Sequence, residues 1–222
     1  MWYDSIMTDQ PVSTETLARR RDPEARPQQI LDAAFHEFGE RGLAGARLDD
    51  IAKRAGVAKG TIYLYFPNKE ALFREMVRST IVDAISSAEA RRDGWGPEDT
   101  AESLLRQLGA GWWAFLRTER VHTLNRLVMA ELRQFPDLVT FYADEVIARG
   151  RRLVAAIIER GIARGEFRPL DAMAAARMYS AIWMSHANWA AMPDLHATPG
   201  SDEHVLHEML DFYLSALRPT AP

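Results

Sequence analysis

Residues 47–76, RLDDIAKRAGVAKGTIYLYFPNKEALFREM, constrain the fold of this chain more than any other segment. Leu48 and Ile51 recur at helical spacing, and Gly56 shortly after them can adopt the backbone conformation of a sharp reversal. The helical pattern then resumes briefly and stops at Pro67. This order predicts two short amphipathic helices joined by a tight turn, within a small all-α module.

The second short helix, from about residue 58 to residue 66, has two faces of different chemistry. Ile62 and Phe66 are four residues apart, so they point inward together onto the preceding helices. Other residues of this helix then face outward as a set that can contact phosphates, base edges and thymine methyl groups of DNA. Alternatively, these residues are half-buried parts of a three-helix packing unit. The outward set is Lys59, Gly60, Thr61, Tyr63 and Tyr65.

The rest of the sequence keeps the helical pattern and lacks the alternation typical of strands. We expect one helix after Pro27 and a long helix from Lys69 to about Arg92, which Asn68 can cap. Gly165 predicts a helix stop, and Asp171 is a plausible cap for the next helix. Further helices are expected at about 98–117, 120–134, 136–164, 171–191 and 202–217.

Composition limits the class of protein. The 222 residues are 47% hydrophobic, enough for a substantial core, and contain no cysteine for disulfides or thiolate metal sites. Because no apolar window reaches membrane-spanning length, we expect a cytoplasmic protein that does not enter the membrane. The net charge is −4, yet residues 19–69 hold ten Lys and Arg against seven Asp and Glu. Positive charge is therefore local, as phosphate binding by one module requires.

Residues 1–26 are polar and show no helical period, which predicts a flexible basic arm. Its run of arginines, Arg19 to Arg21, either reaches a DNA backbone or minor groove, or serves only as a solvated tail. Met1 and Met7 are both candidate starts of the natural chain.

The order Ile-Ala, Ala-Gly-Val, Gly-Thr-Ile-Tyr, Tyr-Phe and Asn-Lys-Glu within residues 28–76 resembles the helix-turn-helix of tetracycline-repressor-like (TetR-type) transcriptional regulators. The resemblance implies an all-α fold with a three-helix DNA-binding domain at residues 27–73. A helical effector-binding and dimerisation domain would follow at residues 74–217.

The resemblance also implies roles for individual residues in DNA binding. Lys59 and Gly60 are expected to approach bases, and Lys69 to bind phosphate at the start of the fourth helix. Arg47 departs from the family pattern, which usually has Ser or Thr there as a helix cap, so the capping bond is in doubt and a phosphate contact is the alternative. Contacts to phosphates or thymine methyl groups would come from Thr61, Tyr63 and Tyr65.

The last two expected helices are the natural surface for self-association. Their alanines permit close backbone approach, and their larger apolar residues can pack against a symmetry copy. The resemblance implies the same homodimer, and two copies would bind a pseudopalindromic double-stranded DNA operator with half-sites roughly 34–36 Å apart or a multiple. The alternative is that these residues form only internal core. The interface candidates are Tyr179, Ile182, Leu206, Met209, Leu210 and Tyr213.

Aromatic and methionine side chains are frequent in the middle of the second domain, which suits a cavity for a flat or flexible apolar molecule. Each of them is also a candidate core residue. His204 and His207 have a spacing that can hold a metal, but we expect them to face solvent because no further ligands are nearby, and we expect no metal or cofactor. The ligand candidates are Trp112, Phe115, Met129, Phe141, Met178, Trp183 and Trp189.

Together these features predict a homodimeric transcriptional regulator, a repressor released from its operator by a small apolar or aromatic effector. One alternative is a constitutive DNA-binding protein without an effector. A second alternative, an all-α enzyme, is disfavoured because the sequence has no nucleophile motif, no HExxH and no glycine-rich phosphate loop.

Overall fold

A computed structural model describes residues 25–190 and 202–219, without the side chains of residues 187–190 and 202. Within this part of the chain, helices follow one another through short turns and no strand occurs, which confirms the all-α prediction. The first half comprises α2 (Arg26–Gly45), α3 (Leu48–Ala55), α4 (Lys59–Tyr65), α5 (Lys69–Val77), η1 (Arg78–Val82), α6 (Asp83–Ala90) and η2 (Arg91–Gly94). The second half comprises α7 (Ala101–Leu116), α8 (Glu119–Glu131), η3 (Leu132–Gln134), α9 (Pro136–Tyr142), η4 (Ala143–Ala148), α10 (Arg149–Ala163), α11 (Ala172–Ala190) and α12 (Asp202–Leu217).

Local signals in the sequence set the ends of several helices. Gly56 lies in the left-handed region at φ 69° and reverses the chain between α3 and α4, and Gly165 at φ 72° follows α10. The Asn68 carboxamide oxygen accepts a hydrogen bond from the Ala71 N–H at 2.7 Å and caps α5. Asp171 caps α11 by accepting two backbone N–H groups. The predicted stops and caps at these positions are confirmed.

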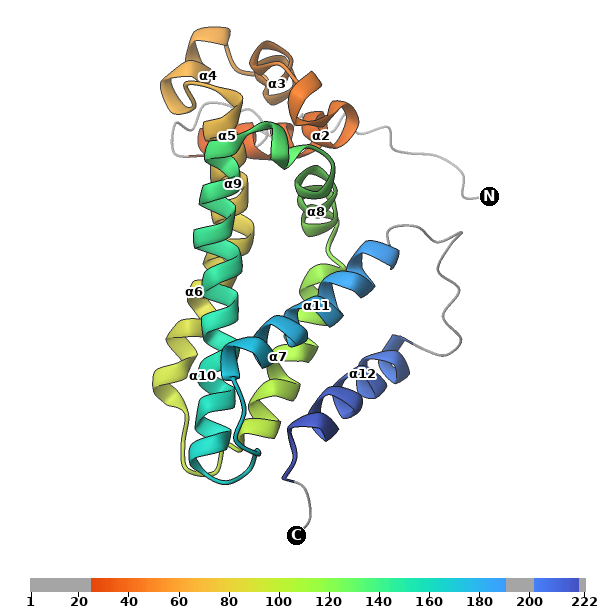
Figure 1. The fold of residues 1–222 in the computed structure, drawn as a ribbon. Helices are drawn as coiled ribbons and strands as arrows, with labels where there is room; N and C mark the ends of the chain where they lie inside the picture. The colour runs from red at the N-terminus through yellow and green to blue at the C-terminus, as the bar shows by residue number, and fades with distance from the viewer. Residues whose placement is uncertain (1–24, 191–201, 220–222) are drawn as a thin grey trace, which may run out of the picture.

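Two long rods run along the molecule beside each other (Figure 1). One begins at α5 and continues through η1 and α6, and the other begins at α9 and continues through η4 into α10. Each rod contains a π-helical segment, η1 and η4 respectively, and these two segments pack against each other. The expected continuous helices at 69–92 and 136–164 therefore exist, but each changes its winding partway along.

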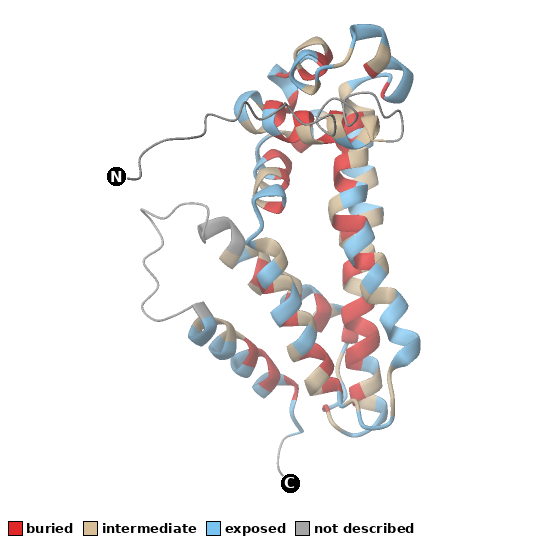
Figure 2. Cartoon of the chain, turned by 180° about the vertical axis from the view of Figure 1, so that it is seen from behind, coloured by how far each residue is buried: buried red, intermediate tan, exposed pale blue. Residues whose placement is uncertain are grey.

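The buried residues form two hydrophobic clusters, one toward each end of the molecule (Figure 2). The first cluster contains residues of the N-terminal helices α2, α3, α4 and α5. Side chains of α8 and α9 also belong to it, among them Leu124, Leu127 and Leu138. The second lies between α7, α10, α11 and α12. The N-terminal helices therefore share their core with residues far beyond the predicted domain end at residue 73.

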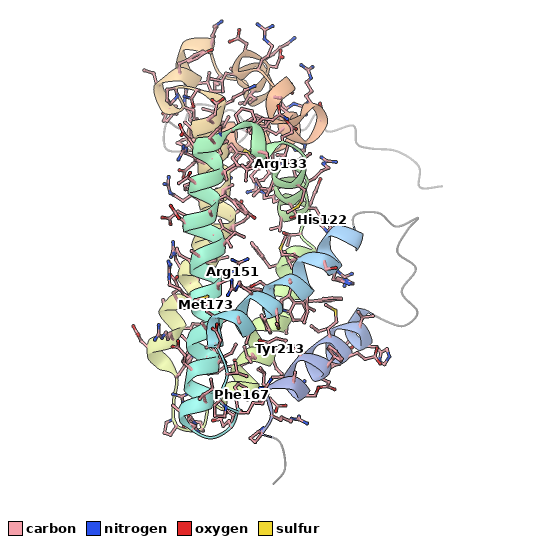
Figure 3. The ribbon with its side chains drawn as sticks, viewed as in Figure 1. His122, Arg133, Arg151, Phe167, Met173 and Tyr213 are labelled. Atoms are coloured by element: carbon pink, nitrogen blue, oxygen red, sulfur yellow. The ribbon has the colours of Figure 1, made fainter. Side chains whose placement is uncertain are left out.

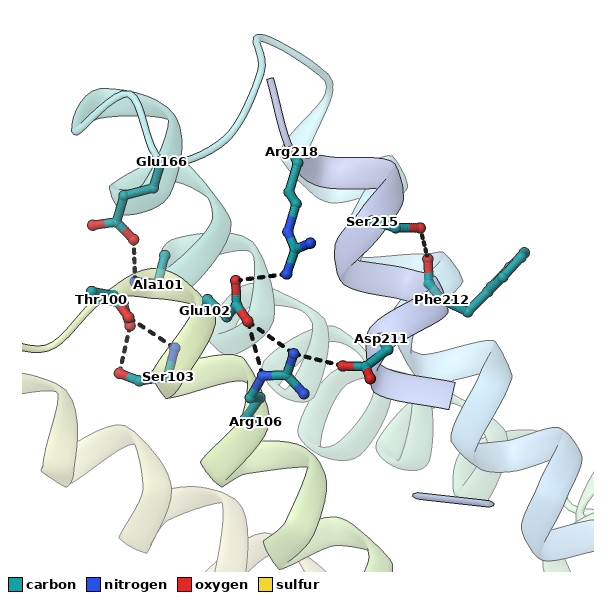
Figure 4. Close-up of polar contacts among 10 residues, drawn as sticks. All are labelled: Thr100, Ala101, Glu102, Ser103, Arg106, Glu166, Asp211, Phe212, Ser215 and Arg218. Carbon is teal, nitrogen blue, oxygen red and sulfur yellow. Dashed lines mark hydrogen bonds and ion pairs between the residues drawn. The ribbon is translucent and has the colours of Figure 1, made fainter. Parts of the chain in front are cut away.

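Helix α12 is held to its neighbours by both packing and polar contacts. Arg106 of α7 bridges Glu102 and Asp211 at 2.8 and 2.6 Å (Figure 4). The buried Tyr213 hydroxyl donates to the Ala175 carbonyl oxygen at 2.7 Å. These contacts fix α12 against α7 and α11.

Candidate functional site

Helix α4 projects from one end of the molecule and is supported by two inward side chains (Figure 1). Ile62 is fully buried and Phe66 is nearly so, both in the first hydrophobic cluster. Tyr63 and Tyr65 are 45% and 38% exposed. The predicted division of this helix into an inward and an outward face is therefore present.

The outward face also contains a residue that the sequence analysis did not include. Leu64 is 84% exposed, the highest exposure of any large hydrophobic residue in the described part of the chain. Its position two residues after Ile62 and two before Phe66 places it opposite the buried face, because successive helical residues are about 100° apart. That periodicity was the available signal, and a leucine there can contact thymine methyl groups.

The N-terminal end of α4 is open and positively charged. Lys59 and Gly60 are exposed, Thr61 is half-buried, and the backbone at Gly60 has open space where a Cβ would lie. The Lys59 ammonium forms an ion pair with Asp49 of α3 at 2.8 Å, and its hydrogen bond to that carboxylate raises the pKa of Lys59. Phosphate binding by Lys59 would require exchange of this partner.

The two remaining basic candidates differ in their surroundings. Arg47 precedes α3 in an extended conformation, is exposed, and provides no side-chain capping bond. The Lys69 ammonium donates to the Ala44 carbonyl oxygen at 2.6 Å and lies 6.0 Å from the centre of the Phe135 ring. Lys69 therefore ties the start of α5 to the end of α2.

A partly open cavity of about 580 Å³ lies between the two rods and helices α7, α8 and α11. Its wall includes Trp112 and Phe115 of α7 and Trp183 of α11, three of the residues predicted to contact a ligand. The volume falls within the roughly 300–1,000 Å³ of small-molecule sites. The cavity therefore has the size and apolar lining for a small molecule.

Other ligand candidates lie away from this cavity. Met129 and Met178 are exposed at the surface, and Phe141 packs at the first cluster beneath the guanidinium groups of Arg74 and Arg78. The side chain of Trp189 is outside the described residues, as are the basic arm with Arg19 to Arg21 and residues 193–200. Helical periodicity could not separate cavity from core, because both use apolar side chains.

The predicted interface residues divide into two groups. Tyr179, Leu210 and Tyr213 are buried inside the chain's own second cluster, and the Tyr179 hydroxyl donates to the Leu105 carbonyl oxygen at 2.7 Å. This burial corresponds to the alternative role as internal core. Ile182, Leu206 and Met209 are half-buried around the same cluster. The exposed large apolar side chains among the described residues of these two helices are instead Met173, Met178 and Phe212, which are 39%, 65% and 78% exposed.

His204 and His207 are both exposed on α12, as expected. His204 lies 3.4 Å from Glu208, and His207 contacts the Glu203 carbonyl oxygen. Across residues 25–190 and 202–219, every helix is too short or too polar to span a bilayer.

A short turn between α3 and α4, a supported α4 and an exposed polar face together define a helix-turn-helix DNA-binding protein. A family model of bacterial regulatory proteins, tetR family, matches residues 30–76. A second model, the C-terminal domain of AefR-like transcriptional repressors, matches residues 103–218. The chain belongs to the TetR family of transcriptional regulators.

Individual relatives agree with this assignment. The chain is 27% identical over 199 residues to the HTH-type transcriptional regulator RutR of Escherichia coli K12, covering 88% of each protein. It is 30% identical to the fatty acid metabolism regulator protein of Bacillus subtilis, covering 68% of this chain and 75% of that protein. The crystal structure of the regulator FadR from Bacillus subtilis in complex with stearoyl-CoA matches with a TM-score of 0.69 at 26% identity, covering 86% and 99% of the two chains.

Proposed function

We propose that two copies of this chain bind a pseudopalindromic operator and repress transcription until a small, largely apolar effector occupies the cavity. The observation that carries the proposal is the exposed surface of α4, where Lys59, Tyr63 and Tyr65 are solvent-accessible while Ile62 of the same helix is fully buried. Internal packing does not explain this face, since its side chains are exposed. Binding to a chromosome would place the protein in the cytoplasm.

The proposed DNA contacts come from Arg47, Lys59, Gly60, Thr61, Tyr63, Tyr65 and Lys69, with Leu64 added from its exposure. Lys59 and Lys69 would exchange their present acceptors, Asp49 and Ala44, for phosphate oxygens. Replacement of a carboxylate or carbonyl partner by phosphate keeps the ammonium hydrogen-bonded while it gains the attraction of the DNA.

Coupling between cavity and operator would use two connections. Ile81 and Ile85 line the cavity from the rod that begins at α5, and Val121 and Asn125 line it from α8. Helix α8 contacts α2 through Arg126, which donates to the Gly39 carbonyl oxygen at 2.7 Å. An effector that fits one placement of these helices better than another would shift the separation of the two α4 helices in the dimer.

The proposed effector has an extended apolar body. The apolar walls of the cavity support this, and the bound stearoyl-CoA of the structurally similar FadR is a molecule of that kind. A constitutive DNA-binding protein is the rival function. It would leave a cavity of this size without a role, and we place it second. Catalysis by this chain is not proposed.

The proposal is tested with a duplex selected by the protein from a random library. Mobility-shift titration of that duplex should show two chains per site. Compounds that raise the Tm of the protein should then release the duplex at concentrations near their Kd. A complex that none of these stabilising compounds dissociates would support the constitutive alternative.

A further inference from the structure

The cavity wall is apolar over most of its area but contains an unusual set of charges. Among the described residues that line it, three are arginines and none is Asp, Glu or Lys. Arg151 comes from α10, Arg177 from α11 and Arg91 from η2. Guanidinium groups stay charged at any physiological pH, so the lining has a fixed positive charge with no carboxylate to balance it.

Arg151 is the half-buried member of this set, and it lacks carboxylate partners of the kind that Arg149 has. Its Nε–H is buried without a hydrogen-bond acceptor, and within the described chain its guanidinium forms no ion pair. Arg149, two residues earlier on the same helix, binds Glu89 and Glu145. Arg151 lies on α10 in the space toward α11 (Figure 3).

A half-buried guanidinium without an acceptor is costly, because the charge has lost part of its hydration and gained no partner. A hydrogen bond from this guanidinium to an oxyanion in the cavity would offset that cost. Arg177 and Arg91 are exposed and line the same cavity, so they add attraction for an anion on its way in.

We propose that the effector site takes an amphipathic anion, a molecule with an extended apolar body and a head group that contains carboxylate or phosphate, and that Arg151 binds an oxyanion of that head group. The apolar body lies against Trp112 and Phe115. The inference rests on the proposed function only in calling the ligand an effector. The binding itself is independent of DNA.

Neutral polar groups in the lining fit the same ligand. Burial raises the pKa of Tyr142 to about 12, so its hydroxyl stays protonated and can donate a hydrogen bond. The Asn125 carboxamide and Ser180 hydroxyl also line the cavity. The Tyr142 hydroxyl can donate to an oxyanion, whereas the Ser180 hydroxyl already donates to the Ala176 carbonyl oxygen at 2.9 Å. None of the three groups adds a negative charge that would repel the oxyanion.

The test compares probes that share one apolar chain and differ in the head group: dodecanoate, dodecyl phosphate, dodecanoyl-CoA and dodecan-1-ol. Binding to the full chain is measured by calorimetry below the concentration at which each probe forms micelles. We expect at least one anionic probe to bind about tenfold or more tightly than the alcohol, since a charge-assisted hydrogen bond replaces an unpaired charge. Which anion is preferred distinguishes a free carboxylate from a phosphate or a thioester ligand.

The variants are Arg151→Met and, as the matched control, Arg152→Met. Arg152 is exposed on the same helix and does not line the cavity. Arg151→Met should lose the preference for the anion while still binding dodecan-1-ol, which shows that the cavity remains folded. Arg152→Met should keep the preference. Equal affinity of the wild type for alcohol and anions, no binding of any probe, or an unchanged preference in Arg151→Met would each overturn the inference.

A parallel mobility shift on the selected duplex separates this inference from the proposed function. Anion preference without any duplex binding would leave the Arg151 site standing and defeat the proposed repressor. Duplex binding by a protein that shows no anion preference would support the proposed repressor and defeat the Arg151 site.

Discussion

Lys59 shows how the isolated protein differs from the DNA-bound state that we propose. In the structure its ammonium is paired with Asp49, and both side chains are substantially exposed. A surface pair of this kind contributes little to folding stability, because solvent screens the attraction. The ion pair therefore orients the Lys59 ammonium on the exposed side of α4, and it is weak enough to be exchanged for a DNA phosphate.

Replacement of Lys59 by Ala should weaken operator binding and lower the slope of log affinity against log salt by about one, because one phosphate contact is lost. Fluorescence anisotropy over a series of salt concentrations measures this slope. Asp49→Asn should strengthen operator binding, since it removes the carboxylate that competes for Lys59 and a negative charge beside the DNA. A Lys59→Ala slope equal to the wild-type slope would rule out the phosphate contact.

Ile62→Ala should destabilise the protein by about 2–5 kcal/mol, because it leaves a cavity beneath α4 at a fully buried site. Leu64→Ala, on the exposed side of the same helix, should change the free energy of unfolding by less than about 0.5 kcal/mol. Urea denaturation measures both. If Leu64→Ala proves as destabilising as Ile62→Ala, the two faces of α4 have been assigned the wrong way round.

The residues of α4 were predictable to the extent that periodicity determines them. The four-residue spacing of Ile62 and Phe66 identified the inward face, but the exposed Leu64 was left out of the predicted outward set. The Ala44 partner of Lys69 and the missing acceptor at the Arg151 Nε–H were not predictable, because they depend on elements distant in sequence. Ala44 lies on another helix, and the isolation of Arg151 becomes visible only when the cavity is assembled.

At the scale of helices, α8 is a second link between the two ends of the molecule. The Glu131 carboxylate at its end accepts hydrogen bonds from the backbone N–H groups of Leu43 and Ala44 at 3.1 and 2.7 Å. Gly42 makes the approach possible, since it has φ 72° and a Cβ there would collide with this carboxylate. Nothing local in the sequence indicates this contact, because its two partners are 88 residues apart.

Glu131→Gln should lower the free energy of unfolding by about 1 kcal/mol, since the carboxamide has one neutral acceptor oxygen where the carboxylate uses two, and one of the two backbone N–H groups loses its acceptor. In a chain of this size that corresponds to a Tm decrease of roughly 2–4 °C, measurable by scanning calorimetry. The exposed Glu159 forms no hydrogen bond with the described residues, so Glu159→Gln is the matched control. Equal Tm values for the two variants would show that the Glu131 contact adds nothing.

The sequence predicted where the helices lie along the chain, but it did not predict the π-helical segments within the two long rods. Caps and stops such as Asn68 and Gly165 are local, so the sequence determines them. The π-helical segments η1 and η4 occur where the two rods pack together. Their winding reflects a tertiary contact that a local pattern does not encode.

For the whole molecule, the main difference concerns the boundary between domains. The predicted division at residue 73 separates regions that share one hydrophobic cluster, since α8 and α9 complete the core of the DNA-binding helices. The sequence pattern predicts that a hydrophobic residue is buried, but it does not predict which residues pack against it. The same limitation explains why Tyr179 and Tyr213 are core residues within one chain.

Phe212→Glu should convert the proposed homodimer into a monomer. Phe212 is 78% exposed, and its ring points away from the polar contacts between α7 and α12 (Figure 4). A buried charge without a partner disfavours association. Light scattering should give twice the 25.1 kDa of one chain for the wild type and the single-chain mass for the variant.

Val139→Glu is the control for that experiment, because Val139 is an exposed apolar residue on α9, away from α11 and α12. This variant should remain dimeric. A monomeric wild type, or a Phe212→Glu variant that keeps the dimer mass, would exclude this face as the interface.

The most direct measurement is selection of duplexes from a random library by the wild type and by Tyr63→Ala at about 0.1 M salt, followed by sequencing. The wild type should enrich an inverted repeat whose half-site centres are about 10 base pairs apart or a multiple of that distance. Tyr63→Ala should lose that enrichment while retaining the wild-type Tm. A wild type that enriches no motif, or a variant that enriches the same motif equally well, would contradict the assignment of α4 as the DNA-binding helix.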